Sequence, residues 1–385
     1  MATSLREPIP PELDDLLAHA ADGGRIDKEQ ALLLYERAPF HELGQAADHV
    51  RRRRYPDGRA TFIIERNINY TNRCVTACKF CAFYASPKSA AGWAHDWAEI
   101  DRRVDEAVAN GACQIMFQGG HNPDFGIEYY EELFGRTRRR HPELFLHALG
   151  GSEIIHISRT SRISIEEAIT RLVAAGLSSL AGAGAEILPS RPRKLIAPLK
   201  ESGEEWLAVM ETAHRLGVES TATLMMGTVE TPEERFEHMR MIRDVQDRTG
   251  GFRAFIHWSY QAENNTLKGQ SPSIFDYLRV LAVARLFFDN VAHIQGSWLT
   301  VGKEVGQLSL HFGADDLGSI MLEENVVSAA GAKHRTDVAE MIHLIRTADR
   351  VPAQRNTLYE IIATFETEVV EPRVTGRSLA AARTR

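Results

Sequence analysis

Three of the four cysteines in this 385-residue chain lie close together. Cys74, Cys78 and Cys81 have the spacing C-x3-C-x2-C and follow a short apolar run at residues 61–65. Three thiolates at such a spacing can bind three corners of a cubane iron–sulfur cluster. The neighbouring sequence offers no fourth cysteine, so one iron would stay open to bind a small molecule. We therefore expect these three residues to hold a [4Fe-4S] cluster.

Two other uses of the cysteines are weaker alternatives. A structural zinc site needs four ligands, commonly from two C-x2-C pairs, and His95 is the nearest candidate for the fourth. Disulfides would leave an odd thiol in the group. Cys113 lies apart, at the start of the second predicted strand, and we expect it to be a buried small hydrophobe.

The composition is that of a globular protein, with 44% hydrophobic and 25% charged residues. The net charge of −7 gives no reason to expect nucleic acid or an anionic membrane as a partner. The N-terminus lacks the apolar segment of a signal peptide, and no stretch has the ~20 apolar residues of a membrane span. We expect a cytoplasmic protein.

Strand-like and helix-like segments alternate along most of the chain. The apolar runs that predict strands are 61–65, 114–117, 145–149, 178–181, 220–226, 253–258, 293–299 and, as a possible eighth, 318–322. The amphipathic stretches that predict helices are 100–110, 127–140, 165–175, 204–216, 232–248, 274–288 and 338–346.

This alternation predicts an α/β fold, a (βα)8 barrel of the TIM type. The predicted parts are an N-terminal helical extension at 1–58, the barrel at 59–325, and a C-terminal helical extension with a frayed tail at 326–385. In such barrels the chemistry lies where the strands end. Glycine-rich and polar motifs stand at these points, among them 118–124, 147–156, 181–188, 221–231 and 323–327.

The cysteine spacing, on the rim of a predicted barrel, resembles the radical S-adenosylmethionine superfamily. With the later motifs, from about residue 60 to about 360, the chain is most similar to the menaquinone-pathway radical enzymes of the cyclic dehypoxanthine futalosine synthase family. The resemblance implies S-adenosylmethionine as second cofactor, bound to the open iron. It implies cofactor contacts from Phe80, Phe83, Gly119, Gly120 and Glu186.

Polar residues after strands two, three and five are candidates for substrate binding or proton transfer. They are Gln118, His121, His147, Glu153 and Glu230, although any one of them could be an ordinary satisfied polar residue. Arg193 and His257 are candidates for binding a substrate carboxylate. The proton-accepting base stays unassigned.

The resemblance also implies a reaction. A 5′-deoxyadenosyl radical would take a hydrogen from ribose C4′ of dehypoxanthine futalosine. The carbon radical would then close a ring on the benzoate, with loss of an electron and a proton. An electron donor such as flavodoxin or ferredoxin would be the protein partner. The alternatives are an aminofutalosine synthase, which adds the adenosyl radical to an enolpyruvyl benzoate, and a non-catalytic iron–sulfur or zinc protein.

Two segments depart from the pattern of that family. Ala183 stands where a glycine is usual, and its methyl group restricts how closely a ligand approaches the backbone. Trp93 and Trp97 form an unusual pair after the cysteines. Both departures raise the question of a different substrate.

Overall fold

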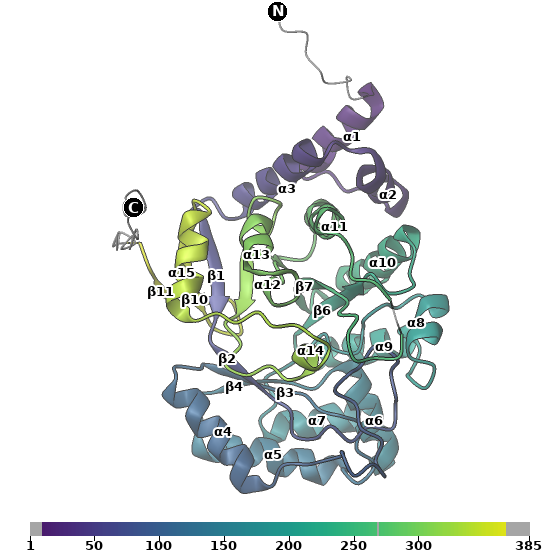
Figure 1. Cartoon of the computed structure of the whole chain (residues 1–385), viewed down its shortest axis with the longest axis vertical. Coiled ribbons are helices and arrows are strands. Elements are labelled where there is room, and N and C mark those ends of the chain that lie inside the picture. Colours follow the sequence, from purple (N-terminus) through teal and green to yellow (C-terminus); the bar gives the residue numbers. More distant parts are fainter. Residues whose placement is uncertain (1–9, 268, 367–385) are drawn as a thin grey trace, which may run out of the picture.

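The computed structural model describes residues 10–267 and 269–366, and their strands form one curled sheet (Figure 1). The spatial order is β11-β10-β1-β9-β8-β7-β6-β5-β4-β3-β2. All neighbouring pairs are parallel except β10 and β11, which are antiparallel. The strands are β1 (Arg59–Ile63), β2 (Glu65–Ile68), β3 (Gln114–Phe117), β4 (Phe145–Ala148), β5 (Ser179–Leu180), β6 (Ser220–Met226), β7 (Phe252–Ser259), β8 (His293–Gln295), β9 (Asp316–Ser319), β10 (Val351–Arg355) and β11 (Ile361–Thr364).

The sheet closes on itself where β1 passes into β2. The first part of this segment pairs with β9 and β10, and the second part pairs with β3. The backbone around Ile64 forms hydrogen bonds on both sides of the chain. The Ile63 carbonyl accepts from Ile320 N at 3.1 Å, and the Ile64 carbonyl accepts from Cys113 N at 3.2 Å. One predicted strand, 61–65, therefore joins the two edges of the sheet, and the predicted barrel is confirmed.

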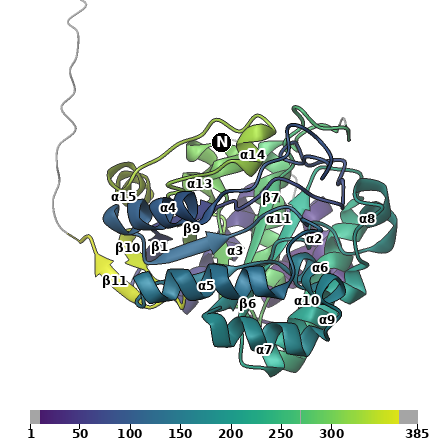
Figure 2. The same ribbon diagram turned by 90° about the horizontal axis from the view of Figure 1, so that it is seen from below.

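The helices surround this sheet. They are α1 (Pro11–Ala21), α2 (Lys28–Arg37), α3 (Phe40–Arg54), α4 (Trp97–Ala109), α5 (Ile127–Arg140), α6 (Gly151–Ser161), α7 (Ile165–Ala175), α8 (Ser190–Ile196), α9 (Gly203–Arg215), α10 (Pro232–Thr249), α11 (Ile274–Phe287), α12 (Trp298–Val301), α13 (Lys303–Ser309), α14 (Val326–Ala329) and α15 (Val338–Thr347). Figure 2 shows α5, α7 and α9 on the outside of the sheet and α15 beside β10. Strand residues facing outward, such as Ile115 and Leu146, are buried against them.

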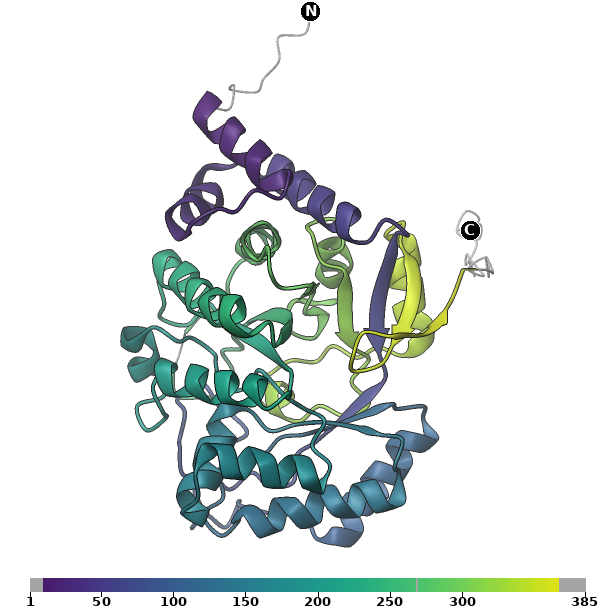
Figure 3. The same ribbon diagram turned by 180° about the vertical axis from the view of Figure 1, so that it is seen from behind.

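The N-terminal extension is helical, as predicted. Figure 3 shows α1, α2 and α3 at the opposite end of the molecule from α4, α5 and α7. Phe40 of α3 packs on Phe312 and Phe275, with ring centroids 4.7 and 5.2 Å apart. The Arg54 guanidinium donates to the Val291 carbonyl at 2.6 Å, just before β8. The extension thus covers α11 and the loops that lead into β8 and β9.

The C-terminal segment differs from the purely helical extension that the sequence predicted. It holds α15, but also β10, which lies parallel to β1, and β11. The run 351–355 contains Pro352 and two polar residues, so its apolar pattern is weak. Pairing with β1 supplies the backbone partners that make it a strand. The predicted frayed tail from residue 367 lies outside the described residues.

Candidate active site

Two cavities meet inside the barrel. The first, which we call the cysteine cavity, has about 170 Å³ and is lined by Cys74, Cys78 and Cys81 together with the loops after β2, β3, β4 and β5. The second, the barrel cavity, has about 310 Å³ and lies among the strands. Both are bordered by the same five residues: Phe80, Gln118, Ala183, Glu186 and Val326. The two cavities therefore adjoin each other and share part of their lining.

The cysteine loop follows β2 and is held by backbone hydrogen bonds. Cys74 N donates to the Ala85 carbonyl at 2.9 Å, and Val75 N donates to the His121 carbonyl at 3.1 Å. Lys79 N reaches the Ile196 carbonyl at 2.8 Å, which ties the loop to α8. All three thiols are half-buried at the cavity wall. The sequence prediction that they share one site agrees with this placement.

Three thiols that line one cavity are the donor set that a cubane cluster needs. Among the described residues, no three His, Cys, Asp or Glu side chains converge as the ligands of one ion would. A cubane cluster instead needs its cysteines spread over three iron corners, with one corner left open. Burial raises the pKa of Cys78 to about 12, so only a bound metal would hold this sulfur as thiolate. His95 lies behind the loop, with its ring 4.4 Å from that of Trp93.

Gly119 and Gly120 lie beside the cysteines, where the surrounding atoms leave no space for a larger residue. A Cβ on Gly120 would lie 2.3 Å from the Arg73 carbonyl oxygen, and one on Gly119 would lie 2.6 Å from the Tyr70 ring. Their N–H groups are already used: Gly120 N donates to the Thr71 carbonyl at 2.9 Å and Gly119 N to Glu153. Any backbone partner for a cofactor amine here would have to be a carbonyl oxygen, and that of Gly120 already accepts from Asn122 N at 2.8 Å.

Glu153 holds the wall of the cysteine cavity. Its carboxylate accepts from Tyr70 Oη at 2.7 Å, Gly119 N at 3.0 Å and Gly150 N at 2.7 Å. Burial raises the pKa of Glu153 to about 7, although these donors oppose the shift. The side chain therefore joins the loop after β3 to the first turn of α6.

Phe80 and Glu186 stand where the two cavities meet, and Phe83 lines the cysteine cavity. The Glu186 carboxylate pairs with Lys200 Nζ at 2.9 Å, and the two side chains are only 12% and 7% exposed. Burial lowers the pKa of Lys200, but the Glu186 carboxylate and other nearby acidic groups raise it more, so the amine stays charged. Lys200 was missed by the sequence analysis, because no motif marks it in the loop before α9.

Gln118 and His147 line the barrel cavity. Gln118 also borders the cysteine cavity, and Asn69 Nδ2 donates to its carbonyl at 3.1 Å. His147 Nδ1 lies 2.7 Å from Ser179 Oγ. Burial lowers the pKa of His147 to about 3, helped by the charges of Arg253 and Arg355, so its ring is neutral. His121 lines the cysteine cavity, where its Nδ1 lies 2.8 Å from Thr76 Oγ1.

The structure does not bring Glu230 to the site. It lines neither cavity, and its carboxylate accepts from Gly227 N at 2.6 Å and from Arg235 Nε at 2.8 Å. Its role is to hold the loop between β6 and α10.

Arg193 and His257, the residues predicted to bind a carboxylate, are also occupied elsewhere. Arg193 is buried on Glu201 and on the carbonyls of Gly184 and Ala185. His257 Nε2 lies 3.0 Å from the Tyr277 carbonyl. Neither residue lines a cavity.

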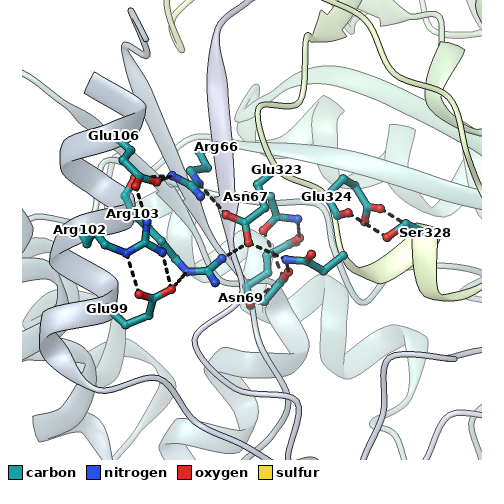
Figure 4. A network of polar contacts seen from close by, with 12 residues as sticks. Arg66, Asn67, Asn69, Glu99, Arg102, Arg103, Glu106, Glu323, Glu324 and Ser328 are labelled. Atoms are coloured by element: carbon teal, nitrogen blue, oxygen red, sulfur yellow. Dashed lines mark hydrogen bonds and ion pairs between the residues drawn. The ribbon is translucent and has the colours of Figure 1, made fainter. Parts of the chain in front are cut away.

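The segment 322–329 covers the meeting point of the two cavities. Figure 4 shows how it is held: Arg66 Nε donates to Glu323 at 2.5 Å, and Arg103 also pairs with Glu323. The Glu324 carboxylate accepts from the N–H groups that start α14, including Val326 N at 2.7 Å. Val326 lines both cavities. The motif at 323–327 thus holds this segment in place over the junction of the two cavities.

The two segments that depart from the family pattern differ in their distance from the cavities. Ala183 lines both cavities, so its methyl group does shape the space. Trp93 packs edge-on to Phe83 at 5.7 Å, and Trp97 stacks on Tyr129 at 5.0 Å. Neither tryptophan lines either of the two cavities: Trp93 supports Phe83 of the cysteine loop, and Trp97 packs on α5.

Comparison with known proteins agrees with this geometry. Residues 68–242 match the family model of the radical SAM superfamily, and residues 249–368 match that of the CofH/MqnC C-terminal region. The chain is 65% identical to the cyclic dehypoxanthine futalosine synthase of Streptomyces coelicolor over 94% of this chain and 92% of that protein. It is 42% identical to the synthase of Halalkalibacterium halodurans, with 92% and 96% covered.

A second group of relatives is more distant. The 5-amino-6-(D-ribitylamino)uracil–L-tyrosine 4-hydroxyphenyl transferase 1 of Methanosarcina mazei is 39% identical, with 89% of this chain and 92% of that protein covered. Among solved structures, the hydrogenase maturase HydG has a TM-score of 0.71 at 14% identity, covering 89% of this chain and 75% of that one. Methylornithine synthase has 0.67 at 17% identity, with 87% and 95% covered. The two solved structures share the fold.

None of the described helices is long and apolar enough to cross a membrane. The cluster and S-adenosylmethionine, predicted from the cysteines and the resemblance, are the cofactors of the superfamily that the model identifies. The chain belongs to the radical SAM superfamily and, within it, to the family that contains the cyclic dehypoxanthine futalosine synthases.

Proposed function

We propose that this chain converts dehypoxanthine futalosine to cyclic dehypoxanthine futalosine. The observation that carries the proposal is a cysteine-lined cavity that adjoins a larger, mostly apolar cavity and shares five lining residues with it. The 65% identity to a synthase of that name, against 39% to the transferase, favours this substrate.

The residues divide the work between the two cavities. Cys74, Cys78 and Cys81 would hold the cluster, which with S-adenosylmethionine supplies a 5′-deoxyadenosyl radical. The pair Glu186 and Lys200 stands at the junction, where the ribose and amino acid parts of a cofactor need polar partners. Gln118 and His147 face the substrate side, and the cover at 322–329 excludes water from reactive carbon centres.

We further propose an external one-electron donor, such as flavodoxin or ferredoxin, and a cytoplasmic location. The three thiols are half-buried and not fully enclosed, which supports electron delivery from a donor outside the protein.

The test is anaerobic. The protein is reconstituted with iron and sulfide, reduced, and given S-adenosylmethionine and dehypoxanthine futalosine. We expect free 5′-deoxyadenosine together with a product two hydrogens lighter than the substrate, both followed by mass spectrometry. An adenosyl group retained in a product formed from enolpyruvyl benzoate would point to the aminofutalosine synthase instead. An intact cluster without 5′-deoxyadenosine would refute radical chemistry.

A further inference from the structure

The floor of the barrel cavity carries positive charge. Arg253 and Arg355 line the barrel cavity but not the cysteine cavity. Arg253 is the second residue of β7, and Arg355 is the last residue of β10. The cavity walls above them are largely apolar and include Ile256, Trp258 and Trp298. A cavity of this kind suits a ligand that is apolar in its middle and anionic at one end.

A β-bulge turns Arg253 toward the cavity. Ser220 of β6 pairs with Phe252, but the next residue, Thr221, pairs with Ala254, so Arg253 is an extra residue in β7. Ile256 and Trp258 line the cavity, and strict alternation would put Arg253 on the outer face of the strand. A bulge changes the direction of a side chain in this way, and bulges are common beside active sites.

The two guanidinium groups differ in how well they are paired. Arg355 forms two hydrogen bonds with the Asp316 carboxylate, at 2.6 and 2.9 Å. Arg253 Nη1 lies 3.2 Å from Glu219, whose side chain is 49% exposed. Arg253 itself is only 9% exposed, and its Nε is buried without a hydrogen-bond partner among the described residues. Arg73, Arg243 and Arg350 also have a buried Nε without a partner among the described residues, but of these arginines only Arg253 lines the barrel cavity.

The surroundings of Arg253 supply no second buried anion for it. The groups with the largest electrostatic effect on Arg253 are Glu219, Tyr359 and Arg355. The Glu65 carboxyl group lines the same cavity but is held by Gln114. Burial lowers the pKa of Arg253, and Arg355 lowers it further, although the group stays charged at neutral pH. The Asp316 carboxylate is taken by Arg355 and by Thr61 Oγ1 at 2.6 Å. The floor thus holds one guanidinium with spare hydrogen-bonding capacity.

We propose that Arg253 binds the carboxylate of the substrate at the floor of the barrel cavity, an inference that rests on the proposed function. The reacting sugar carbon must lie near the junction at Phe80 and Glu186, where the cysteine cavity opens. The aryl ring then lies between Ile256 and Trp298, and the carboxylate reaches the floor. Arg253 is a specificity residue, because its guanidinium group donates to a carboxylate and binds a neutral carboxamide more weakly.

Binding to unreduced holoenzyme with S-adenosylmethionine tests this without turnover. Dehypoxanthine futalosine and its carboxamide analogue are titrated calorimetrically into wild type, Arg253→Gln and Arg253→Lys. We expect Arg253→Gln to weaken binding of the carboxylate by roughly 10- to 100-fold and to change carboxamide binding by less than about 3-fold. Arg253→Lys keeps the charge and should restore part of the loss.

Arg248→Gln is the matched control, because Arg248 is an exposed arginine of α10 that pairs with Glu211 on the surface. It should bind both ligands as wild type does. Turnover then separates the two proposals. If wild type fails to convert the substrate, the proposed function is wrong. If wild type converts it and Arg253→Gln shows the same KM and the same preference for carboxylate over carboxamide, the role of Arg253 is refuted and the proposed function stands.

Discussion

The cysteine cavity adjoins the barrel cavity, but its walls and the floor of the barrel cavity are formed by different parts of the protein. Backbone dominates at the cysteine cavity: loops after the strands approach each other closely, with Gly120 against the Arg73 carbonyl. Side chains dominate at the floor, where Asp316 binds Arg355 and Glu65 accepts a hydrogen bond from Gln114.

This difference has a chemical reason. A cluster with its cofactor needs carbonyls, thiols and room, and glycines provide the close approach that such a site requires. A floor inside a barrel is cut off from water, so its charges must be paired or reserved for a ligand. We therefore expect the cysteine cavity to be sensitive to added atoms and the floor to be sensitive to lost charges.

The largest effect is expected at the cluster ligands. Cys78→Ala should reduce 5′-deoxyadenosine formation to background, because the cluster loses one of its three protein ligands. Cys113→Ala is the control: Cys113 lines neither cavity, and its Sγ lies 3.8 Å from the Ile64 carbonyl. Iron content and 5′-deoxyadenosine are measured for both. Equal loss in the two variants would contradict the assignment.

The next largest effect is expected at the buried ion pair of the junction. Lys200→Met leaves the Glu186 carboxylate buried without its partner, which should destabilise the protein by about 3–5 kcal/mol. The double variant Lys200→Met/Glu186→Gln removes both charges and should recover much of the stability, while S-adenosylmethionine binding stays impaired. Urea unfolding and equilibrium dialysis report the two quantities. If the double variant bound the cofactor like wild type, the pair would have no part in binding.

Gly120→Ala tests the close packing of the cysteine cavity. The added Cβ would lie 2.3 Å from the Arg73 carbonyl, and we expect a loss of about 3 kcal/mol with a lower iron content. Gly217→Ala is matched to it, since Gly217 has φ +77° but open space around it. The control should lose about 1 kcal/mol through its backbone alone and keep full iron. Thermal unfolding measures the loss of stability, and iron analysis measures whether the cluster site is damaged.

The smallest effect concerns the floor and depends on pH. Burial raises the pKa of Glu65 to about 7, above its ordinary value of 4.5, while Arg355 opposes the shift. The folded state therefore favours the protonated form, and this contribution to stability is lost as the pH rises from about 4.5 through 7. Glu65→Gln should shrink the fall in unfolding free energy between pH 5 and 7 by about 2 kcal/mol.

Urea unfolding at several pH values measures this fall for wild type and Glu65→Gln. Glu166→Gln, at an exposed position in the first turn of α7, is the control and should leave the pH dependence unchanged. Parallel pH profiles for Glu65→Gln and wild type would show that Glu65 is ionised throughout this range.

Much of the cysteine cavity could be predicted because its parts are close together in the sequence. The three thiols, Gly119 and Gly120 come from two short motifs, each directly after a predicted strand. Predictions that relied on a single residue were less successful. Glu230 also follows a strand, but its carboxylate turns back to the N–H of Gly227. Position after a strand brings a residue near the rim, and local hydrogen bonds decide whether it faces the cavity.

The sequence by itself determined the group of three cysteines that lines one cavity, the alternation of strands and helices, and the barrel that follows from them, because each of these depends on neighbours along the chain. Only the tertiary structure decided that β10 joins the sheet beside β1, that Lys200 meets Glu186, and that a bulge turns Arg253 inward. The physical reason is that a closed barrel brings side chains from distant strands into one interior. Register and burial there are properties of the assembled sheet, and no single stretch of sequence records them.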